Sequence, residues 1–223
     1  DIGDIVGVKG FVMMTRTGEL TIRCEKYTHL TKCLHPLPEK FHGLTDVEER
    51  YRRRYLDLIM NDEAKAVALM RPKMVRSIQQ YLDSQGYVEV ETSMLSPILG
   101  GASARPFVTH HNALDKDFYL RIATEINLKK LLVGGLERVY EIGRLFRNEG
   151  MDSTHNPEFT TIEAYEAYGD LQSMRRLAEN MIRKAAKDVT GSAIVTYQDK
   201  VLDFKSPFRW VSMAELIKEK TGI

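Results

Sequence analysis

Alternating apolar and polar positions dominate the first 34 residues. The run from Ile5 to Val12 has strand character, Thr17-Gly18 suits a turn, and the run from Glu19 to Cys24 alternates with a period of two. A third strand-like run extends from Tyr27 to Leu34. The pattern predicts a small β-meander of about three strands.

After these strands, apolar residues recur at the spacing of a helix between residues 36 and 85. Thr45 or Asp46 suits the N-cap of a short helix within residues 36–61, and this helix would present three apolar or aromatic side chains on one side: Tyr51, Tyr55 and Leu58. From residue 62 to residue 85, apolar residues recur every three or four positions. Gly86 suits the end of that helix, and Pro72 is expected to kink or split it. Residues 87–91 then alternate as a strand.

The sequence pattern in the middle of the chain predicts a hairpin followed by a helix. Two strands lie on either side of a turn at residues 112–115, and Thr124 suits the N-cap of a helix from Glu125 to about Val133. His110 and His111 are adjacent, so on a strand they face opposite sides. That placement favours packing or hydrogen bonding over a shared metal.

A second hairpin is predicted at residues 139–168, where two strand-like runs flank the turn-rich segment 150–157. Alternation places one apolar set together: Tyr140, Ile142 and Phe146. The opposite face of the first strand carries Gly143, Arg147 and Glu149. The matching face of the second strand carries Phe159, Thr161, Glu163 and Tyr165.

That polar face has the side chains needed to bind a nucleotide and an amine. The planar fork of Arg matches paired phosphate oxygens, an aromatic ring can stack on a base, and carboxylates bind an ammonium group. A salt-bridged surface hairpin is the alternative that alternation alone leaves open.

The last part of the chain alternates helix, hairpin and helix. Asp170 suits the cap of a helix that Gly191 ends, residues 194–204 suit a hairpin that turns near residues 199–200, and Ser212 with Glu215 forms a capping box.

Composition, charge and cysteine spacing limit the classes of protein to which the chain can belong. The chain is 43% hydrophobic and 28% charged, and its net charge of +1 gives no general case for nucleic-acid binding. Arg50, Arg52, Arg53 and Arg54 form a local basic cluster, which a solvated helix face also explains. Cys24 and Cys33 lack CxxC spacing, so they favour neither zinc nor a disulfide framework and fit a reduced cytosolic protein. No apolar run reaches the roughly 18 residues of a membrane span. P-loop, GxGxxG and HExxH signatures are absent.

Two stretches carry a family resemblance. Phe146-Arg147-Asn148-Glu149, a loop, and then His155-Asn156-Pro157-Glu158-Phe159 resemble the second signature motif of class II aminoacyl-tRNA synthetases. The stretch HNPEFTTIEAY resembles the lysine-specific members, and the resemblance is dense from about Pro36 to Ile223. By this resemblance the chain is identified as a member of the lysyl-tRNA synthetase family.

The resemblance implies an α+β fold, with a class II antiparallel sheet flanked by helices and preceded by a partial OB-fold. Its domains would be residues 1–35 (partial OB-fold), 36–61 (linker) and 62–223 (part of the catalytic domain). The helix and strand around residues 62–91 resemble the first class II motif, which forms a dimer interface, although Ser93 stands where that motif has a proline. The partial OB-fold has too few strands to close, so no anticodon contacts are assigned.

The implied activity is ATP-dependent activation of lysine to lysyl-adenylate, followed by transfer to tRNA(Lys), by a cytoplasmic homodimer. ATP is the co-substrate and Mg²⁺ the cofactor, and none of the 223 residues is expected to be a metal ligand. The chain begins without Met, and no glycine-rich, Arg-bearing third motif follows Tyr168. We therefore expect a piece of a longer enzyme that is inactive by itself, with the Mg²⁺ ligands in the missing C-terminal part.

The resemblance also implies site residues. Arg147 would be catalytic and would bind the α-phosphate and the lysine carboxylate. ATP would be held by Arg147 together with Glu149, His155, Asn156 and Phe159. Lysine would be held by Gly101, Glu125, Glu163 and Tyr165. The family shows a proline where Thr124 stands and an aromatic residue near Asn127, so this pocket wall differs slightly.

Three alternatives stay open at this point. An aspartyl- or asparaginyl-tRNA synthetase shares the layout, but its substrate is not cationic, and Glu163 argues against it. A relative that lysylates a protein is disfavoured by the OB-like strands before Pro36. A non-catalytic binding module is disfavoured by the set of Arg147, Glu149 and Phe159.

Overall fold

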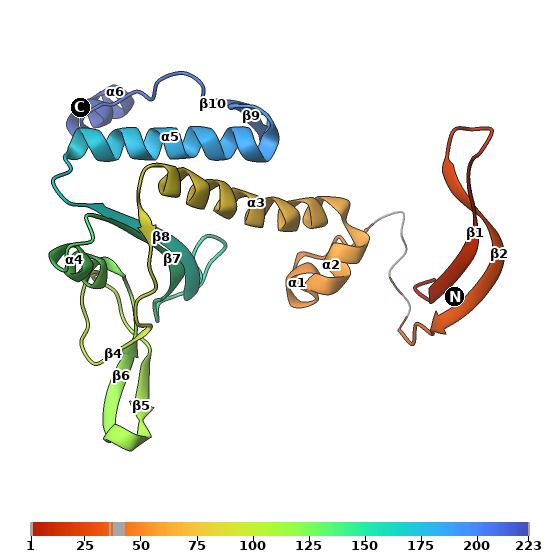
Figure 1. The fold of residues 1–223 in the computed structure, drawn as a ribbon, viewed down its shortest axis with the longest axis horizontal. Helices are drawn as coiled ribbons and strands as arrows, with labels where there is room; N and C mark the ends of the chain where they lie inside the picture. Colours follow the sequence, from red (N-terminus) through yellow and green to blue (C-terminus); the bar gives the residue numbers. More distant parts are fainter. Residues whose placement is uncertain (1, 36, 38–42, 223) are drawn as a thin grey trace. The chain divides into compact units, whose positions relative to one another are not determined.

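The computed structural model describes residues 2–35, 37 and 43–222, and the chain divides into two compact units, residues 1–70 and 71–223 (Figure 1). Residues 1, 36, 38–42 and 223 lie outside the described part, and they include the start of the predicted linker. Antiparallel sheets flanked by helices confirm the α+β class. No helix in the described residues has the length and apolar character needed to cross a membrane.

The first unit begins with a long antiparallel hairpin of β1 (Ile5–Met14) and β2 (Leu20–Thr31). The prediction of about three strands was wrong, because the runs from Glu19 and from Tyr27 form one continuous strand. The pairing of β1 with β2 shifts its register between Lys9 and Gly10. At Gly10 a Cβ would lie 1.9 Å from the carbonyl oxygen of Arg23, so a side chain there would clash with the partner strand.

Two short helices follow, α1 (Val47–Arg52) and α2 (Arg54–Met60), where one helix was predicted. Asp46 caps α1 as expected, with its Oδ1 accepting the N–H of Glu49 at 2.7 Å. The break at Arg53 brings Arg50 and Arg54 onto the buried carboxylate of Asp57, which also accepts from Asn61 at 2.6 Å. Two arginines and an amide therefore share one buried acceptor beside the break.

Tyr51 and Tyr55, which were expected on one side of a single helix, are exposed, and Leu58 is partly buried. The local basic cluster is paired within its own segment. Arg52 pairs with Glu48 and Arg53 with Glu49, each at a spacing of four residues. These two pairs fit a solvated helix face, whereas Arg50 and Arg54 hold the buried Asp57.

Helix α3 (Asp62–Ser84) runs through Pro72 without interruption. Of the two outcomes expected at Pro72, a split does not occur, and a kink stays a prediction. The helix ends as predicted at Gly86, whose φ is +78°. The N–H groups of Gly86 and Tyr87 return to the carbonyl oxygens of Asp83 and Leu82 at 3.0 and 3.1 Å.

The central sheet of the second unit has the strand order β3-β7-β8, with β3 (Val88–Glu89), β7 (Arg138–Phe146) and β8 (Glu158–Glu166). Strand β3 is parallel to β7 and covers only two residues of the predicted strand 87–91. Strands β7 and β8 form the predicted hairpin, in a register that places Glu141 opposite Glu163 and Leu145 opposite Phe159.

One face of this sheet packs against helices. Leu82, Tyr87 and Tyr140 form a buried cluster, against which side chains of α3 and of α5 (Leu171–Thr190) pack. Helices α3 and α5 lie side by side over the sheet (Figure 1), and the hydroxyl of Ser77 donates to Asp188 at 2.6 Å between them. The predicted apolar side of the hairpin, with Tyr140 and Ile142, is confirmed.

A smaller three-stranded sheet holds β4 (Leu95–Ser96), β6 (Lys116–Leu120) and β5 (Val108–His111), and the 3-10 helix η1 (Asn112–Leu114) makes the predicted turn. His110 lies 2.9 Å from Asp117, and His111 packs on Phe118. The interpretation of the two histidines as packing and hydrogen-bonding residues is confirmed. Helix α4 (Glu125–Val133) then has the predicted bounds.

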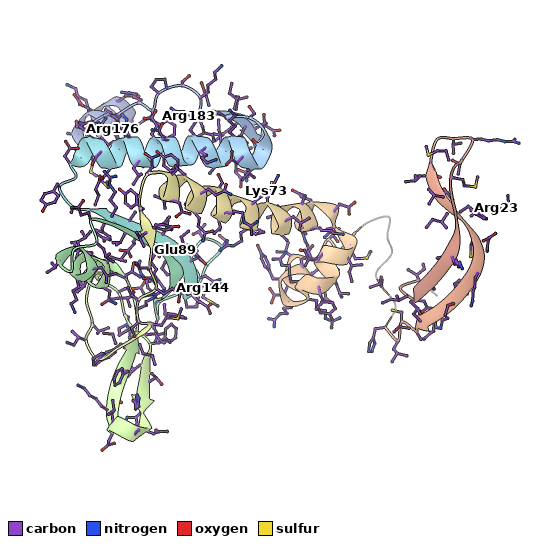
Figure 2. All side chains as sticks on the ribbon, viewed as in Figure 1. Arg23, Lys73, Glu89, Arg144, Arg176 and Arg183 are labelled. Atoms are coloured by element: carbon purple, nitrogen blue, oxygen red, sulfur yellow. The ribbon has the colours of Figure 1, made fainter. Side chains whose placement is uncertain are left out.

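The last elements also match their prediction. Asp170 and Ser173 form a capping box for α5, and Gly191 ends it with a φ of +80°. Strands β9 (Ile194–Tyr197) and β10 (Lys200–Asp203) form a hairpin, and Ser212 caps α6 (Met213–Thr221). Arg183 of α5, labelled in Figure 2, donates to the carbonyl oxygens of Phe204 and Ser206 and so ties the segment after β10 to the helix.

Candidate functional site

The site face of the central sheet is the face turned away from α3 and α5. It carries the odd-numbered residues of β7 and of β8 between 139 and 165. Arg147 and Glu149 were expected within the strand, and this was wrong because β7 ends at Phe146. The N–H of Arg147 still donates to the carbonyl oxygen of Pro157 at 2.8 Å. Pro157 has no N–H to return, so the ladder stops there.

Arg147 and Phe159 form a stacked pair at the end of this face. The guanidinium carbon of Arg147 lies 5.2 Å from the centre of the Phe159 ring. The Nε of Arg147 is buried and has no hydrogen-bond partner among the described residues. A buried donor of this kind calls for an acceptor, and a phosphate or carboxylate oxygen is suited to it.

Glu149 joins this pair to the loop before β5. Its Oε1 accepts the main-chain N–H of Arg105 at 3.4 Å, and the N–H of Asn148 donates to the carbonyl oxygen of Arg105 at 2.8 Å. The structure therefore places the loop of residues 97–107 beside the end of β7.

The loop between β7 and β8 is organised by Asp152. Its carboxylate accepts the N–H groups of Thr154 and His155 at 2.7 and 2.8 Å and contacts Nδ1 of His155 at 2.8 Å. The hydrogen bond from the main chain of Thr154, more than any other contact, holds the pKa of Asp152 well below its usual range. His155 and Asn156 are exposed. No hydrogen bond or ion pair within the described part of the chain joins them to Arg147 or Phe159.

Glu163 is the centre of an acidic cluster on β8. Its Oε1 accepts the main-chain N–H of Thr124 at 3.1 Å, and its Oε2 accepts the hydroxyl of Tyr165 at 3.0 Å. Burial raises the pKa of Tyr165, and the hydrogen bond to Glu163 raises it further, so this hydroxyl remains a donor at neutral pH.

Glu125 and Gly101 complete that cluster. Glu125 is the first residue of α4, and its Oε1 accepts from Nζ of Lys129 at 2.6 Å. Gly101 has a φ of +87°, and a Cβ there would lie 3.0 Å from Cβ of Ala123 and 3.3 Å from Cβ of Glu125. The close approach of the loop to α4 therefore depends on glycine at position 101.

Thr124 occupies the N-cap position of α4 as predicted, but its side chain makes no capping hydrogen bond. Its Oγ1 is buried without a partner in the described residues, so the prediction of a side-chain cap was wrong. The carboxylate of Glu163 accepts the N–H of Thr124 instead. An anion placed at a helix N-terminus is stabilised by the unpaired N–H groups and by the helix dipole.

One buried ion pair on the site face was missed by the sequence reasoning. Arg121 and Glu141 have side chains that are only 3% and 5% exposed, and they are paired with each other. Arg121 also donates from Nε to the carbonyl oxygen of Arg144 at 2.9 Å, and Glu141 accepts from the hydroxyl of Thr92 at 2.7 Å. The alternation of the hairpin places Glu141 on the face of Glu163, whereas no local pattern identifies Arg121 as its partner.

Most of the predicted site residues thus form two groups, on or beside one face of the central sheet. One group lies around the start of α4 and comprises Gly101, Glu125, Glu163 and Tyr165. Arg147 and Phe159 are stacked, Glu149 lies on the adjacent loop, and His155 and Asn156 stand apart. Within residues 2–35, 37 and 43–222, no group of three or more His, Cys, Asp or Glu side chains is arranged to hold a metal ion.

Comparison with known proteins identifies the family. The family model described as tRNA synthetases class II (D, K and N) matches residues 46–223. A protein named lysine–tRNA ligase from Lysinibacillus sphaericus is 55% identical over 223 residues, and those of the same name from Enterococcus faecalis and Streptococcus suis are 56% identical. Each match covers 100% of this chain and 45% of the relative. The chain thus spans a little under half the length of these curated relatives, and, since the family model covers most of it, the chain belongs to the class II tRNA synthetases of the D, K and N group.

Proposed function

We propose that the whole protein activates lysine with ATP and transfers the lysyl group to tRNA(Lys). The observation that carries this proposal is the arrangement on the site face. Glu163, the centre of the acidic cluster, lies on the same face of β8 as Phe159, on which Arg147 stacks. Phe159 and Glu163 are four residues apart on β8, or about 13 Å at the rise of a strand. An extended lysyl-adenylate likewise has an ammonium group at one end and adenine at the other.

In the first step, a carboxylate oxygen of lysine attacks the α-phosphorus of ATP. A new P–O bond forms, the bond to the β-phosphate oxygen breaks, and pyrophosphate leaves. Arg147 binds the α-phosphate and the lysine carboxylate, where its fork offsets the negative charge of both. Its unpartnered Nε and its stacking on Phe159 support this role.

Phe159 provides the surface for adenine, and Glu149, His155 and Asn156 hold the adenine and phosphates. The exposure of His155 and Asn156 supports a loop that moves toward the nucleotide when it binds. In the second step, a hydroxyl at the 3′ end of tRNA attacks the carbonyl carbon of the adenylate, and AMP leaves. Positioning and charge compensation carry both steps, so no covalent nucleophile is required.

Glu125, Glu163 and Tyr165 bind the amino groups of lysine, with Gly101 allowing close approach of the loop. A carboxylate accepts the donors of an ammonium group, and two carboxylates beside one cluster favour a cationic substrate. The names of the relatives support lysine, whereas the family model also covers the aspartate and asparagine groups. Glu163 has no cationic partner within the described residues, which supports an external ammonium as its ligand.

Class II synthetases use ATP with Mg²⁺ in general. The described residues offer no fit for that ion, so we assign it no ligand and no step in this part of the chain. We further propose a homodimer that forms through the segment around β3 and works in the cytoplasm. At Ser93 the hydroxyl donates to the carbonyl oxygen of Leu95 at 2.6 Å, so the turn forms without a proline. Sedimentation equilibrium of the whole protein tests the dimer, and a monomer would contradict it.

The function is tested by amino-acid-dependent exchange of pyrophosphate into ATP, catalysed by the whole protein. We expect exchange with lysine and none above background with aspartate or asparagine. Exchange with aspartate equal to that with lysine would overturn lysine specificity. Absence of exchange with all three amino acids would support the non-catalytic binding module instead.

A further inference from the structure

The chain's own lysine side chain lies in the acidic cluster. Nζ of Lys129 is 2.6 Å from Oε1 of Glu125 and 5.7 Å from the centre of the Tyr165 ring. Glu125 and Tyr165 are two of the residues to which the proposed function assigns the substrate lysine. An ammonium group identical to that of the substrate side chain therefore already contacts this part of the site.

Helix geometry explains this placement. Glu125 and Lys129 are four residues apart on α4, the spacing at which side chains of one helix face meet. The pair is accessible, with side-chain exposures of 56% for Lys129 and 36% for Glu125. An accessible pair of this kind contributes little to stability and exchanges readily with other ions. Lys129 is therefore a partner that a second ammonium group can displace.

Among the described residues, Lys129 is the cation paired with this cluster, through Glu125. Glu163 is occupied by the N–H of Thr124 and the hydroxyl of Tyr165, both uncharged donors. Glu163 accepts from the hydroxyl of Tyr165, and Lys129, the partner of Glu125, lies over the ring of the same tyrosine. Lys129 compensates part of the negative charge of this cluster while the substrate is absent.

We propose that Lys129 is a specificity-determining residue of the lysine site: it pairs with Glu125 until an ammonium group of the substrate displaces it, and this competition sets the affinity for lysine. The inference rests on the proposed function, since it names the residue that the substrate must displace. A ligand that cannot offer a cation for Glu125 would leave the pair of Glu125 and Lys129 in place. The pair thus weakens binding only of a ligand that must displace Lys129, and the contact of that ligand's ammonium group with Glu125 compensates for the lost pair.

The neighbouring Lys130 provides a matched control. It carries the same charge one residue further along α4, but it lines a cavity with residues of the 95–100 segment instead of the acidic cluster. A general effect of removing one positive charge near a cationic substrate would be similar for both lysines. Competition for Glu125 would affect only Lys129.

The experiment is calorimetric titration of the whole protein with lysine, using Lys129→Gln, Lys129→Arg and Lys130→Gln. We expect Lys129→Gln to lower the Kd for lysine about three- to fivefold, the scale of an accessible ion pair. Lys129→Arg, which keeps the competing charge, and Lys130→Gln should each stay within about 1.5-fold of wild type. The Kd for ATP should not change in any variant.

The possible results distinguish a failure of this inference from a failure of the proposed function. An unchanged or raised Kd for lysine in Lys129→Gln, with binding intact in wild type, would overturn the competition and leave the function standing. Equal tightening in Lys129→Gln and Lys130→Gln would also overturn it, because a general charge effect would then suffice. Failure of wild type and all variants to bind lysine would overturn the proposed function itself.

Discussion

The main-chain N–H of Thr124 donates to Oε1 of Glu163 at 3.1 Å, so the first residue before α4 is tied to the middle of β8. The other oxygen of the same carboxylate accepts the hydroxyl of Tyr165 at 3.0 Å. The two contacts engage both oxygens of one carboxylate. They fix the orientation of the carboxylate, so that little side-chain entropy remains to be lost when a substrate binds.

Glu163→Gln is expected to lower kcat/KM for lysine at least tenfold. The amide keeps the size of the side chain but loses the negative charge, and its NH₂ group faces either the N–H of Thr124 or the hydroxyl of Tyr165. A tenfold loss corresponds to about 1.4 kcal/mol. Lysine-dependent pyrophosphate exchange measures it.

Glu158→Gln is the matched control for that change. Glu158 lies on the same strand, is exposed, and pairs with Arg144 at 3.2 Å on the opposite sheet face. Its replacement should leave kcat/KM for lysine within about twofold of wild type, because only a surface ion pair is lost. A loss as large as that of Glu163→Gln would contradict the assignment of Glu163 to the lysine site.

Thr124→Val should stabilise the protein. The Oγ1 of Thr124 is buried without a partner among the described residues, and valine replaces it with a methyl group while keeping the N–H that Glu163 accepts. Removing an unsatisfied buried hydroxyl should raise the free energy of unfolding by about 1 kcal/mol. Thr92→Val makes the opposite test, since the hydroxyl of Thr92 donates to Glu141 at 2.7 Å and its loss should destabilise. Urea unfolding of both variants checks the two signs.

Arg147→Ala should abolish adenylate formation and leave the fold intact. Arg147 lies beyond the end of β7 and contacts the ring of Phe159, so its removal costs one cation–π contact and creates no core cavity. Pyrophosphate exchange gives the activity, and urea unfolding gives the stability. A loss of about 2 kcal/mol or more, the scale of a core truncation, would mean that Arg147 is structural. Arg144→Ala, which removes an exposed arginine three residues earlier, should retain activity.

Much of the fold follows from local sequence signals. The period of two predicts the hairpin of β7 and β8, and the capping residues Asp46, Asp170 and Ser212 mark helix starts that the structure confirms. The break at Arg53 could not be predicted in this way. Beside this break Arg50 and Arg54 contact one buried carboxylate, and the burial of Asp57 is a tertiary property.

The candidate site is predictable to a similar extent. Alternation places Phe159, Glu163 and Tyr165 on one face, as the register of β7 and β8 has them. The contact of Glu163 with Thr124 and the pairing of Arg121 with Glu141 join segments that are distant in sequence. Periodicity describes only one element at a time, so contacts between elements remain outside its reach.

Stability should fall at acid pH through Asp57. Burial works to raise the pKa of Asp57, but the hydrogen bond from Asn61 and the contacts of Arg50 and Arg54 outweigh it, and the pKa lies below its usual value. A carboxyl whose pKa is lowered by folding stabilises the folded state above the unfolded pKa, which is about 3.9 for Asp. That contribution is lost as the pH falls through the lowered folded value.

The measurement is the Tm of wild type and Asp57→Asn between pH 7 and pH 3. Wild type should lose more Tm than the variant below about pH 5, because the variant has no carboxyl to protonate at this position. The variant should have the lower Tm at pH 7, where the ionised Asp57 holds the two arginines. Parallel curves for the two proteins would contradict the role of Asp57.

Arg121 and Glu141 should behave as one unit in stability. Both side chains are almost fully buried, and Arg121 also holds the end of β7: its Nε donates to the carbonyl oxygen of Arg144, and its own carbonyl oxygen accepts the N–H of Phe146. Arg121→Met leaves a buried carboxylate without its cation and should cost about 3 kcal/mol or more. Glu141→Met should cost a similar amount for the converse reason.

The double variant Arg121→Met/Glu141→Met should be far more stable than the sum of the two single losses predicts, since it leaves no unpaired charge in the core. Arg138→Met is the contrasting case. The pair of Arg138 with Glu166 is half open to solvent on the arginine side, so its loss should cost about 1 kcal/mol or less. Urea unfolding of wild type, the two single variants and the double variant gives the coupling energy of Arg121 with Glu141. If the losses in the free energy of unfolding for Arg121→Met and Glu141→Met add up to the loss of the double variant, the two side chains act separately. The main-chain contacts of Arg121 alone would then hold the site face in place.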